Sequence, residues 1–223
     1  MKWTWFERGM DLLFPPRCPF CGRLLLHTGV CPKCLAALPW TENAVRHLPG
    51  GPDCAAPLWY EGLAREGLLR LKFRDSPAGA RPLGELAARC AAACFPGAFD
   101  TVTWVPVSRR RRWQRGYDQS RLLARSVGRC LGLPVMGLLE KTVDNPAQSG
   151  IADAAARRAN VLGVYRARSG ALGRRVLLVD DICTTGATLC ECARELRLAG
   201  AQSVTCVAAA LSREKKVHKN TEE

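Results

Sequence analysis

One stretch limits what this chain can fold into more than any other: residues 176–188 read Val-Leu-Leu-Val-Asp-Asp-Ile-Cys-Thr-Thr-Gly-Ala-Thr. Its four apolar residues are typical of a buried parallel strand, and they run into two adjacent carboxylates, Asp180 and Asp181. A short Thr/Gly loop and a helix-like run, residues 189–199, follow. The order strand, loop, helix predicts an α/β fold in which a Rossmann-like parallel sheet is flanked by helices. The carboxylates then lie at the edge where open α/β sheets bind their ligands.

The loop after the carboxylates has the properties of a phosphate site. Backbone N–H groups at the start of a helix are unpaired, and the helix dipole favours an anion there. Two neighbouring carboxylates can accept hydrogen bonds from two adjacent hydroxyls, such as those of a ribose. The stretch therefore predicts a ligand with a phosphate at one end and a diol near it, as in a ribose 5-phosphate. The residues expected to bind it are Asp180, Asp181, Thr184, Thr185, Gly186, Ala187 and Thr188.

This thirteen-residue pattern resembles the signature of the type I phosphoribosyltransferases, which bind phosphoribosyl pyrophosphate (PRPP). The resemblance implies that Asp180 and Asp181 are the catalytic pair that anchors the ribose hydroxyls, and that Mg²⁺ arrives with PRPP. Mg²⁺ and Arg would stabilise the departing pyrophosphate as the anomeric carbon passes through an oxocarbenium-like state. The alternative is a buried strand whose solvated Asp pair caps a helix, but a cap explains one acidic or Thr residue and not the whole run.

Two Cys-x-x-Cys pairs near the start of the chain predict a structural zinc site. The pairs are Cys18/Cys21 and Cys31/Cys34, with nine residues between them. Each pair places two sulfurs on one side, and two pairs complete a tetrahedral thiolate site. A segment this small has too little core to fold alone, so metal binding would supply folding free energy. A redox pair is the alternative, and His27, between the pairs, could replace a thiolate.

Charge and cysteine content bound the partners and the compartment. The formal net charge is +13, and the chain holds 12 cysteines in 223 residues. No run approaches the ~18 apolar residues of a membrane span, and no signal peptide is recognisable, so we expect a cytoplasmic protein with reduced thiols. The basic balance favours a polyanionic partner, nucleic acid above all, although a biased genomic composition gives the same charge.

An arginine-rich segment follows the first predicted strand of the α/β core, residues 101–107. Residues 109–129 hold eight Arg against one Asp. Guanidinium groups bind pyrophosphate by bidentate contacts, and we expect Arg109 to do so for PRPP. The segment could also hold a nucleic-acid backbone, with Trp113 or Tyr117 stacking on a base, and the alternative to both is a solvated basic loop. The candidate nucleic-acid residues are Arg110, Arg111, Arg112, Trp113, Arg115, Arg121 and Arg125.

A narrower resemblance rests on several motifs taken together. The first predicted strand ends in Val-Pro-Val, Gln-Arg-Gly-Tyr-Asp-Gln spans residues 114–119, and Leu-Leu-Arg-Leu-Lys-Phe spans residues 68–73. With the cysteine pairs, these motifs resemble the competence protein F (ComF) family. That family joins an N-terminal zinc-binding segment to a phosphoribosyltransferase-like domain and is associated with single-stranded DNA handling during natural transformation. The implied partners are PRPP, single-stranded DNA and a DNA-translocating helicase of the competence machinery.

The resemblance also implies a hairpin over residues 138–165 that closes over the ligand, with Gln148, Arg157 and Asn160 at the matching positions. Such a loop excludes water and brings cationic groups to the leaving pyrophosphate, so Arg157 joins the expected PRPP ligands. Between Gln148 and Tyr165 there is no Lys, which counts against an orotate-type enzyme.

The expected order of segments follows from these features. A helix-like start, residues 1–16, precedes the cysteine pairs, and Pro49-Gly50-Gly51-Pro52 is typical of a linker. Only Cys54 follows the two pairs, where many relatives in the resembled family carry further pairs around a second metal. The expected segments are an N-terminal helix and zinc-binding segment (1–49), a linker (50–58), a phosphoribosyltransferase-like domain (59–211) and a disordered tail (212–223).

Two functions stay open from the sequence. The first is a PRPP-binding accessory protein that grips single-stranded DNA with its zinc segment and its arginine face. The second is an active phosphoribosyltransferase that transfers ribose 5-phosphate from PRPP to a small nitrogenous acceptor. The arginine-rich segment and the family resemblance favour the first, whereas the intact acidic pair is neutral to slightly favourable for the second. The sequence holds no recognisable acceptor pocket.

Overall fold

The main sheet of the computed structural model is almost entirely parallel. The described residues are 16–73, 77–144 and 161–213. The strand order is β1-β2-β8-β7-β4, with β3 also paired to β8, and only β1 and β2 pair in antiparallel fashion. The strands of this sheet are β1 (Val45–His47), β2 (Asp53–Ala55), β3 (Leu58–Trp59), β4 (Thr101–Trp104), β7 (Arg175–Cys183) and β8 (Ser203–Leu211).

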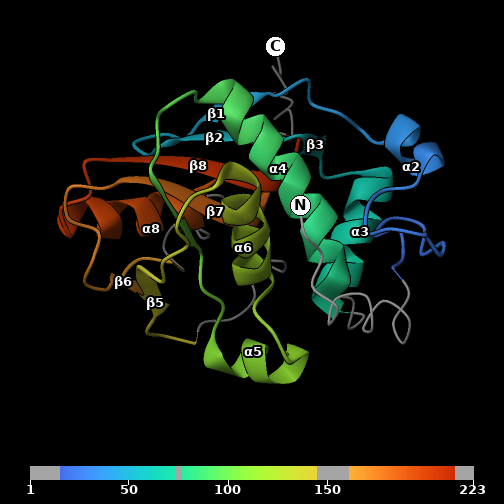
Figure 1. The fold of residues 1–223 in the computed structure, drawn as a ribbon. Coiled ribbons are helices and arrows are strands. Elements are labelled where there is room, and N and C mark those ends of the chain that lie inside the picture. Colours follow the sequence, from blue (N-terminus) through green and yellow to red (C-terminus); the bar gives the residue numbers. More distant parts are fainter. Residues whose placement is uncertain (1–15, 74–76, 145–160, 214–223) are drawn as a thin grey trace, which may run out of the picture.

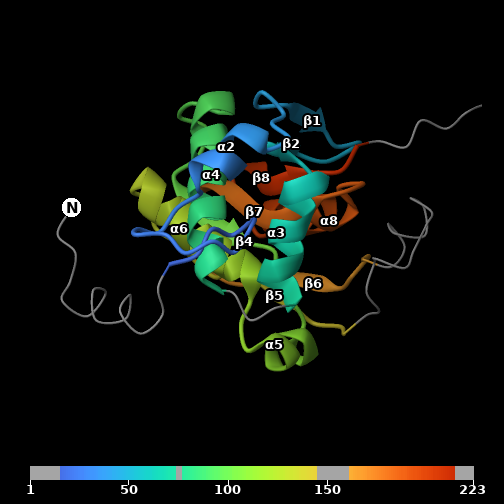
Figure 2. The same cartoon turned by 90° about the vertical axis from the view of Figure 1, so that its right-hand side faces the viewer.

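Helices cover both faces of this sheet (Figure 1, Figure 2). A short 3₁₀ turn, η1 (Pro77–Gly79), leads into α4 (Ala80–Cys94), which lies beside α6 (Gln119–Leu131) on one face. The opposite face is covered by α8 (Ala187–Leu198). Helices α4 and α6 approach closely because Gly84 has no side chain: a Cβ there would lie 2.5 Å from the Cβ of Ser126. The predicted parallel sheet flanked by helices is therefore confirmed.

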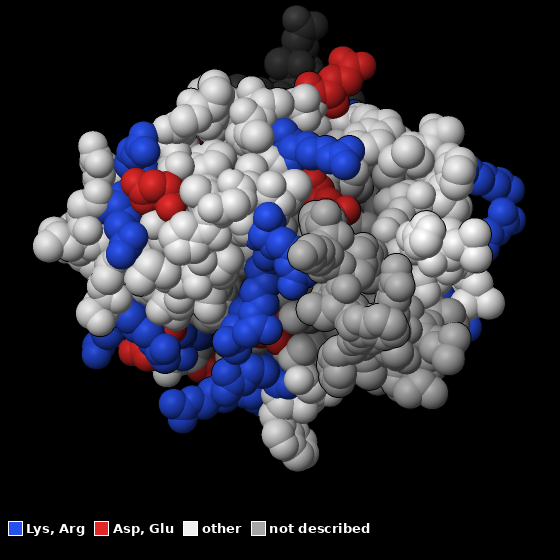
Figure 3. All heavy atoms as spheres, in the orientation of Figure 1, with Lys and Arg blue, Asp and Glu red and all other residues white. Residues whose placement is uncertain are grey.

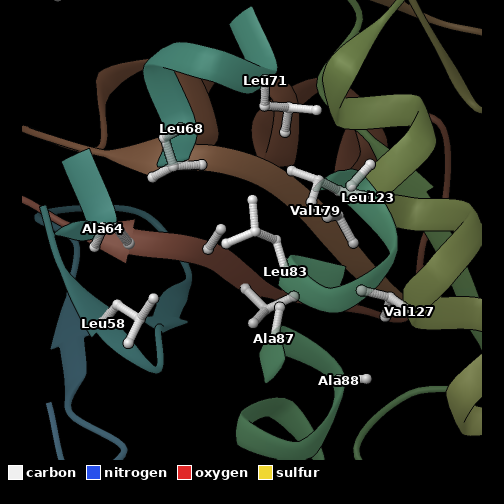
Figure 4. Close-up of a cluster of buried hydrophobic side chains, with 14 of the residues drawn as sticks. Leu58, Ala64, Leu68, Leu71, Leu83, Ala87, Ala88, Leu123, Val127 and Val179 are labelled. Atoms are coloured by element: carbon white, nitrogen blue, oxygen red, sulfur yellow. The ribbon is translucent and has the colours of Figure 1, made fainter. Parts of the chain in front are cut away.

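The core runs without interruption from the sheet into the helices. Val179 of β7, Leu83 of α4 and Leu123 of α6 are at most 1% exposed and lie close together in the cluster that Figure 4 shows. Residues 176–179 of β7 are fully buried, as predicted, because both faces of a central parallel strand are covered. Each such side chain stabilises the fold by roughly 1.5–3 kcal/mol relative to an exposed one.

The four-cysteine segment packs onto the body of the protein through α3 (Gly62–Phe73). Phe20 is fully buried and lies against α3 at Gly67. A Cβ on Gly67 would come within 2.6 Å of the Phe20 ring, so this contact requires glycine. The short helix α2 (Pro32–Ala37) follows the second cysteine pair. This segment therefore shares one apolar core with α3 and α4 and is not a separate appendage.

The sheet extends into residues that the sequence assigned to a linker. Strand β2 and the start of β3 lie within residues 50–58, and β1 lies within the predicted N-terminal segment. The Pro/Gly cluster forms the turn of the β1–β2 hairpin, where the N–H of Gly51 donates to the carbonyl of Leu48 at 2.8 Å. Strands of two or three residues are too short for hydrophobic periodicity to reveal. The division into two domains stays a prediction.

The arginine run forms a helix, α5 (Arg109–Arg115), where the sequence also allowed a loop. Ser108 is its N-cap, and the Ser108 hydroxyl oxygen accepts from the N–H of Arg111 at 3.3 Å. Gly116, with φ of 73°, ends the helix in the left-handed conformation that favours glycine. The sequence analysis did not predict this helix, although both local signals, the N-cap serine and the terminal glycine, are present in the sequence.

An antiparallel pair forms the base of the expected hairpin: β5 (Leu139–Lys141) pairs with β6 (Tyr165–Ala167). The positions predicted to act in the hairpin, Gln148, Arg157 and Asn160, lie outside the described residues. So do the predicted N-terminal helix up to residue 15 and the tail from residue 214 onward.

Candidate functional site

A cavity of about 940 Å³ opens at the carboxyl ends of β4 and β7. Its walls come from the end of α3, from α5 and the segment before it, from the β5–β6 hairpin and from the loop between β7 and α8. Arg109 does not line this cavity and borders a smaller hollow beside residues 140–144. The predicted PRPP ligands that line the cavity are Asp180, Asp181, Thr184, Gly186, Ala187 and Thr188.

The two carboxylates lie inside β7, because the strand continues past them to Cys183. Asp180 Oδ1 accepts from the hydroxyl of Ser120 at 3.0 Å and from the N–H of Asp181 at 2.8 Å. Asp181 Oδ2 accepts from Gln119 Nε2 and forms an ion pair with Lys72 Nζ, each at 3.0 Å. Two strand residues are thus held by the first turn of α6 and the last turn of α3.

Burial, and after it the neighbouring charge of Asp181, raises the pKa of Asp180 to about 7. The hydrogen bonds from Ser120 and the Asp181 N–H act in the opposite direction. Lys72 compensates the charge of Asp181 in the same site. Near neutral pH the pair therefore changes its charge readily when a ligand with hydroxyls or a cation arrives.

The loop at residues 184–188 has the geometry expected of a phosphate site. Gly186 is the N-cap of α8 with φ of 78°, and a Cβ there would lie 2.4 Å from Leu48. Arg46 Nη1 donates to the carbonyl of Thr184 at 2.6 Å. The β1–β2 hairpin therefore supports the loop from behind, through Leu48 and Arg46, while the N-terminus of α8 faces the cavity.

The Gln-Arg-Gly-Tyr-Asp-Gln motif connects α5 to α6 and fixes both to the site. The Tyr117 hydroxyl donates to the carbonyl of Leu71 on α3 at 2.5 Å. Asp118 caps α6 by accepting from the N–H of Arg121 at 3.0 Å, and it also accepts from the N–H of Val107 at 3.3 Å. Burial raises the pKa of Asp118. The motif is thus a junction of three elements, and its last residue, Gln119, reaches the acidic pair.

Helix α5 presents two different faces. Arg111 and Arg115 are half-buried and line the cavity, and Arg115 Nη1 donates to Gln119 Oε1 at 2.9 Å. Trp113 is 87% exposed on the other face. Arg111 and Arg115 were predicted as nucleic-acid candidates, and the structure places both in the wall of the cavity. The exposed Arg side chains of this helix are Arg109, Arg110 and Arg112.

The cavity is cationic. Among the described residues five basic side chains line it against two carboxylates, a balance that suits a ligand with several negative charges. Burial, then the charge of Arg111, lowers the pKa of Lys141 to about 8. Lys141 Nζ lies 5.5 Å from the ring centre of Tyr165, and burial raises the pKa of Tyr165. The five are Arg65, Lys72, Arg111, Arg115 and Lys141.

The four cysteines meet as predicted. Their sulfurs lie within 4.8 Å of one another, and those of Cys21 and Cys31 are 3.7 Å apart. A tetrahedral zinc with Zn–S bonds of about 2.3 Å requires sulfurs about 3.8 Å apart, so the arrangement fits zinc. Cys31 Sγ also accepts from the N–H of Cys34 at 3.4 Å, the kind of contact that supports a metal-binding thiolate. Among the described residues, this is the one cluster with metal-ligand geometry, and His27 and Cys54 are not in it.

The remaining nucleic-acid candidates lie on an exposed basic surface. Arg121, Arg125 and Arg129 recur every four residues on the solvent side of α6. Figure 3 shows Lys and Arg side chains in a band over α6 and α5. The guanidinium of Arg121 also lies over the ring of Trp104, 5.5 Å from its centre. We call the exposed Arg of α5 and α6, with Trp113, the basic band.

Within the described ranges, no helix combines the length and apolar character needed to cross a bilayer.

Several residues at the site were missed from the sequence. Lys72 and Gln119 belong to motifs that the family resemblance had singled out, so a role near the ligand could have been suspected. Ser120 and Arg46 carried no such signal, because a serine in a helix and an arginine in a charged chain are common. Their roles depend on contacts between distant parts of the sequence.

Comparisons with known proteins agree with this architecture. A phosphoribosyl transferase domain model matches residues 118–222, and a double zinc ribbon domain model matches residues 9–64. The chain is 31% identical over 197 residues to DNA utilization protein YhgH of Escherichia coli O157:H7, covering 84% of this chain and 80% of that protein. It is 34% identical over 108 residues to competence protein F of Haemophilus influenzae, covering 47% of each. It is 27% identical over 177 residues to competence protein ComFC of Bacillus subtilis, covering 79% of this chain and 70% of that protein.

Proposed function

This chain belongs to the competence protein F family, and on that premise we propose that it binds PRPP with Mg²⁺ and handles single-stranded DNA during DNA uptake. We place this role in the cytoplasm, where its thiols stay reduced. Relatives named for DNA utilization and for competence support the DNA role.

The observation that carries the PRPP proposal is the meeting of Asp180, Asp181 and the loop at 184–188 in one cationic cavity. The carboxylates accept hydrogen bonds from the ribose hydroxyls, and the backbone N–H groups of the loop bind the 5-phosphate. Arg111 and Arg115 bind the pyrophosphate group. The carboxylate oxygens beside this anionic ligand suit Mg²⁺, which would neutralise charge on the pyrophosphate.

Calorimetric titration tests this proposal. Mg²⁺·PRPP is titrated into the wild type and into the Asp180→Asn/Asp181→Asn variant. We expect saturable binding that weakens by about 100-fold in the variant, because each hydrogen bond to a charged group contributes roughly 1.5–3 kcal/mol. The absence of PRPP binding by the wild type would overturn the proposal.

The basic band is the proposed track for single-stranded DNA. Its arginines are exposed, those of α6 recur every four residues, and Trp113 offers a ring on which a base can stack. Affinity for an oligonucleotide should therefore fall steeply as the salt concentration rises, whereas PRPP affinity should fall less steeply. A wild type that shows no affinity for single-stranded DNA at low salt contradicts this part. A DNA-translocating helicase of the competence machinery is the protein partner that this role implies, and co-purification of the two tests it.

Active phosphoribosyl transfer is the second candidate, and one observation favours it. Tyr60, Leu69 and Phe73 give the cavity a partly apolar wall, which offers a planar acceptor a place beside the ribose. Release of pyrophosphate from PRPP in the presence of purines, pyrimidines or amines tests this activity. If none of these acceptors releases pyrophosphate, PRPP acts as a bound signal and not as a substrate.

A further inference from the structure

Lys72 occupies a position that neither the sequence analysis nor the family comparison assigns. It lies in the last turn of α3, lines the cavity, and places Nζ 3.0 Å from Asp181 Oδ2. Both partners are largely buried, with 19% of the Lys72 side chain and 7% of the Asp181 side chain exposed. An ammonium has three donors, so the contact with Asp181 leaves others for a ligand.

The ion pair belongs to the same network as the cations of α5. Asp181 Oδ2 accepts from both Lys72 and Gln119, and Gln119 Oε1 accepts from Arg115. The loop at residues 184–188, which is proposed to bind the 5-phosphate, follows the acidic pair in the chain, beyond Cys183. Lys72 is therefore grouped with the side chains proposed for the pyrophosphate and not with the 5-phosphate loop.

The position of Lys72 is fixed from two sides. The carbonyl of Leu71 accepts from the Tyr117 hydroxyl on the α5–α6 side. On the other side, Phe20 of the cysteine segment is fully buried against Gly67, one helical turn before Leu71. Helix α3 is thus held between the cysteine segment and the Gln-Arg-Gly-Tyr-Asp-Gln motif, whose last residue contacts Asp181.

We propose that Lys72 contacts the pyrophosphate group of the bound ligand, and that the cysteine segment positions Lys72 through Phe20 and α3. This inference rests on the proposed PRPP site and gives the cysteine segment a part in it. Because α3 is packed on both sides, the ammonium group of Lys72 would be held in a fixed position where it compensates the negative charge of the pyrophosphate. The opposing explanation is that Lys72 only neutralises Asp181.

Three ligands separate the two explanations. PRPP, inorganic pyrophosphate and ribose 5-phosphate, each with Mg²⁺, are titrated calorimetrically into the wild type, Lys72→Met and Lys72→Arg. We expect Lys72→Met to weaken PRPP and pyrophosphate by about tenfold or more and to leave ribose 5-phosphate within about twofold, with partial recovery in Lys72→Arg. Arg89→Met, an exposed site on α4 away from the cavity, is the matched control and should change none of the three.

Equal losses for all three ligands would mean that Lys72 only maintains Asp181, and unchanged affinities would remove it from the site; either result overturns the inference. A wild type that binds pyrophosphate but not PRPP refutes the proposed function, while Lys72→Met still tests the pyrophosphate contact. A wild type that binds neither overturns both.

A glycine pair tests the route from the cysteine segment. Gly67→Ala would place a Cβ 2.6 Å from the Phe20 ring, whereas Gly29→Ala, in the same segment as Phe20, meets no atom within 4 Å. We expect Gly67→Ala alone to weaken pyrophosphate binding several-fold, with one zinc per chain retained, and to have no further effect in a Lys72→Met background. An equal loss in that background, or no loss at all, overturns the positioning role. If Gly67→Ala does not fold, Phe20→Leu makes the same test.

Discussion

In the loop at residues 184–188, an anion would meet backbone N–H groups at the fixed start of a helix. On α5, an anion would meet long side chains that extend from an exposed helix. The loop is held by Arg46 and Leu48, and Gly186 leaves no room for a Cβ. Helix α5 has no buried residue, and Trp113 is 87% exposed. Under the proposed function, the loop would bind a single phosphate in one position, and the exposed face of α5 would bind a row of phosphates in many positions.

This difference predicts different kinds of binding. A fixed loop discriminates by geometry, so small backbone changes should abolish binding, while salt should matter less than it does for DNA. A basic helix binds by charge and by counterion release, so single changes should weaken binding gradually and salt should dominate. A variant of the loop whose binding depends mainly on salt, or a variant of α5 that abolishes binding at once, would contradict this difference between the two regions.

The largest effect is expected at Gly186. Gly186→Ala places a Cβ 2.4 Å from Leu48 at a φ of 78°, which displaces the loop from its position at the start of α8. We expect PRPP affinity to fall by about 100-fold or more, because misplacement of about 1 Å can cost that much. Calorimetric titration measures it.

Gly132→Ala is the matched control for that variant. Gly132 has a φ of 68° but no atom within 4 Å of a built Cβ. Both variants should lose about 1 kcal/mol of folding stability from the left-handed conformation, and only Gly186→Ala should lose ligand. Equal ligand affinity in the two variants would show that the loop is not the phosphate site.

A smaller effect is expected at Trp113. Trp113→Ala removes an exposed ring and should weaken single-stranded DNA binding by about tenfold, because stacking on one base contributes roughly 1–3 kcal/mol. Trp113→Phe keeps a ring and should retain most of the affinity. Fluorescence anisotropy with a labelled oligonucleotide gives both numbers, and PRPP affinity should be unchanged. A loss of PRPP affinity in Trp113→Ala would show that the loop and α5 belong to one binding site.

The exposed arginines of α5 sharpen the comparison through salt. In Arg110→Gln/Arg112→Gln the slope of log affinity for single-stranded DNA against log salt should become shallower by about 1.4, because each neutralised phosphate of a single strand adds about 0.7 to that slope. The affinity itself should fall several-fold at low salt. Arg197→Gln, at an exposed site on α8 on the opposite face of the sheet, serves as the control for overall charge. An unchanged slope would exclude these two side chains from the DNA track.

The smallest effect concerns pH in the cavity. The pKa of Lys141 is lowered to about 8, so Lys141 loses its charge as the pH rises through 8, where an ordinary lysine stays charged. PRPP affinity should therefore fall about three- to fivefold between pH 7 and pH 9, a range in which the phosphates of the ligand are already ionised. Lys141→Arg keeps its charge and should reduce this decline, leaving the part contributed by the ionisation of Asp180, whose pKa is raised to about 7. Identical pH profiles for the two proteins would show that Lys141 does not face the ligand.

What the sequence predicted well was local. Residues 176–188 indicated a buried strand, a carboxylate pair and a helix start, because hydrophobic runs and a glycine at positive φ are properties of neighbouring residues. The four cysteines met as predicted, since spacing alone brings two knuckles together. The parallel sheet followed from the alternation of strands and helices.

What the sequence could not predict depended on distant contacts. Lys72 reaches Asp181, and Arg46 reaches Thr184, across more than a hundred residues, and no local pattern encodes such a pairing. Strands β2 and β3 were hidden because they are too short to show a period. Helix α5 was not predicted, because a run of four arginines shows no hydrophobic period; its ends are fixed by Ser108 and Gly116.

The support of the loop at residues 184–188 by the β1–β2 hairpin has a consequence for the order of assembly. Arg46 donates to the carbonyls of Thr184 and Ser212, which lie 138 and 166 residues later in the chain. The hairpin leaves the ribosome early, but its partners are made near the end of synthesis. Contacts of such long range slow folding, because a large loop must close before they form. The loop at residues 184–188 therefore reaches its supported position only after β8 is in place, and a nascent chain that stalls before residue 212 would lack the contact between Arg46 and Ser212.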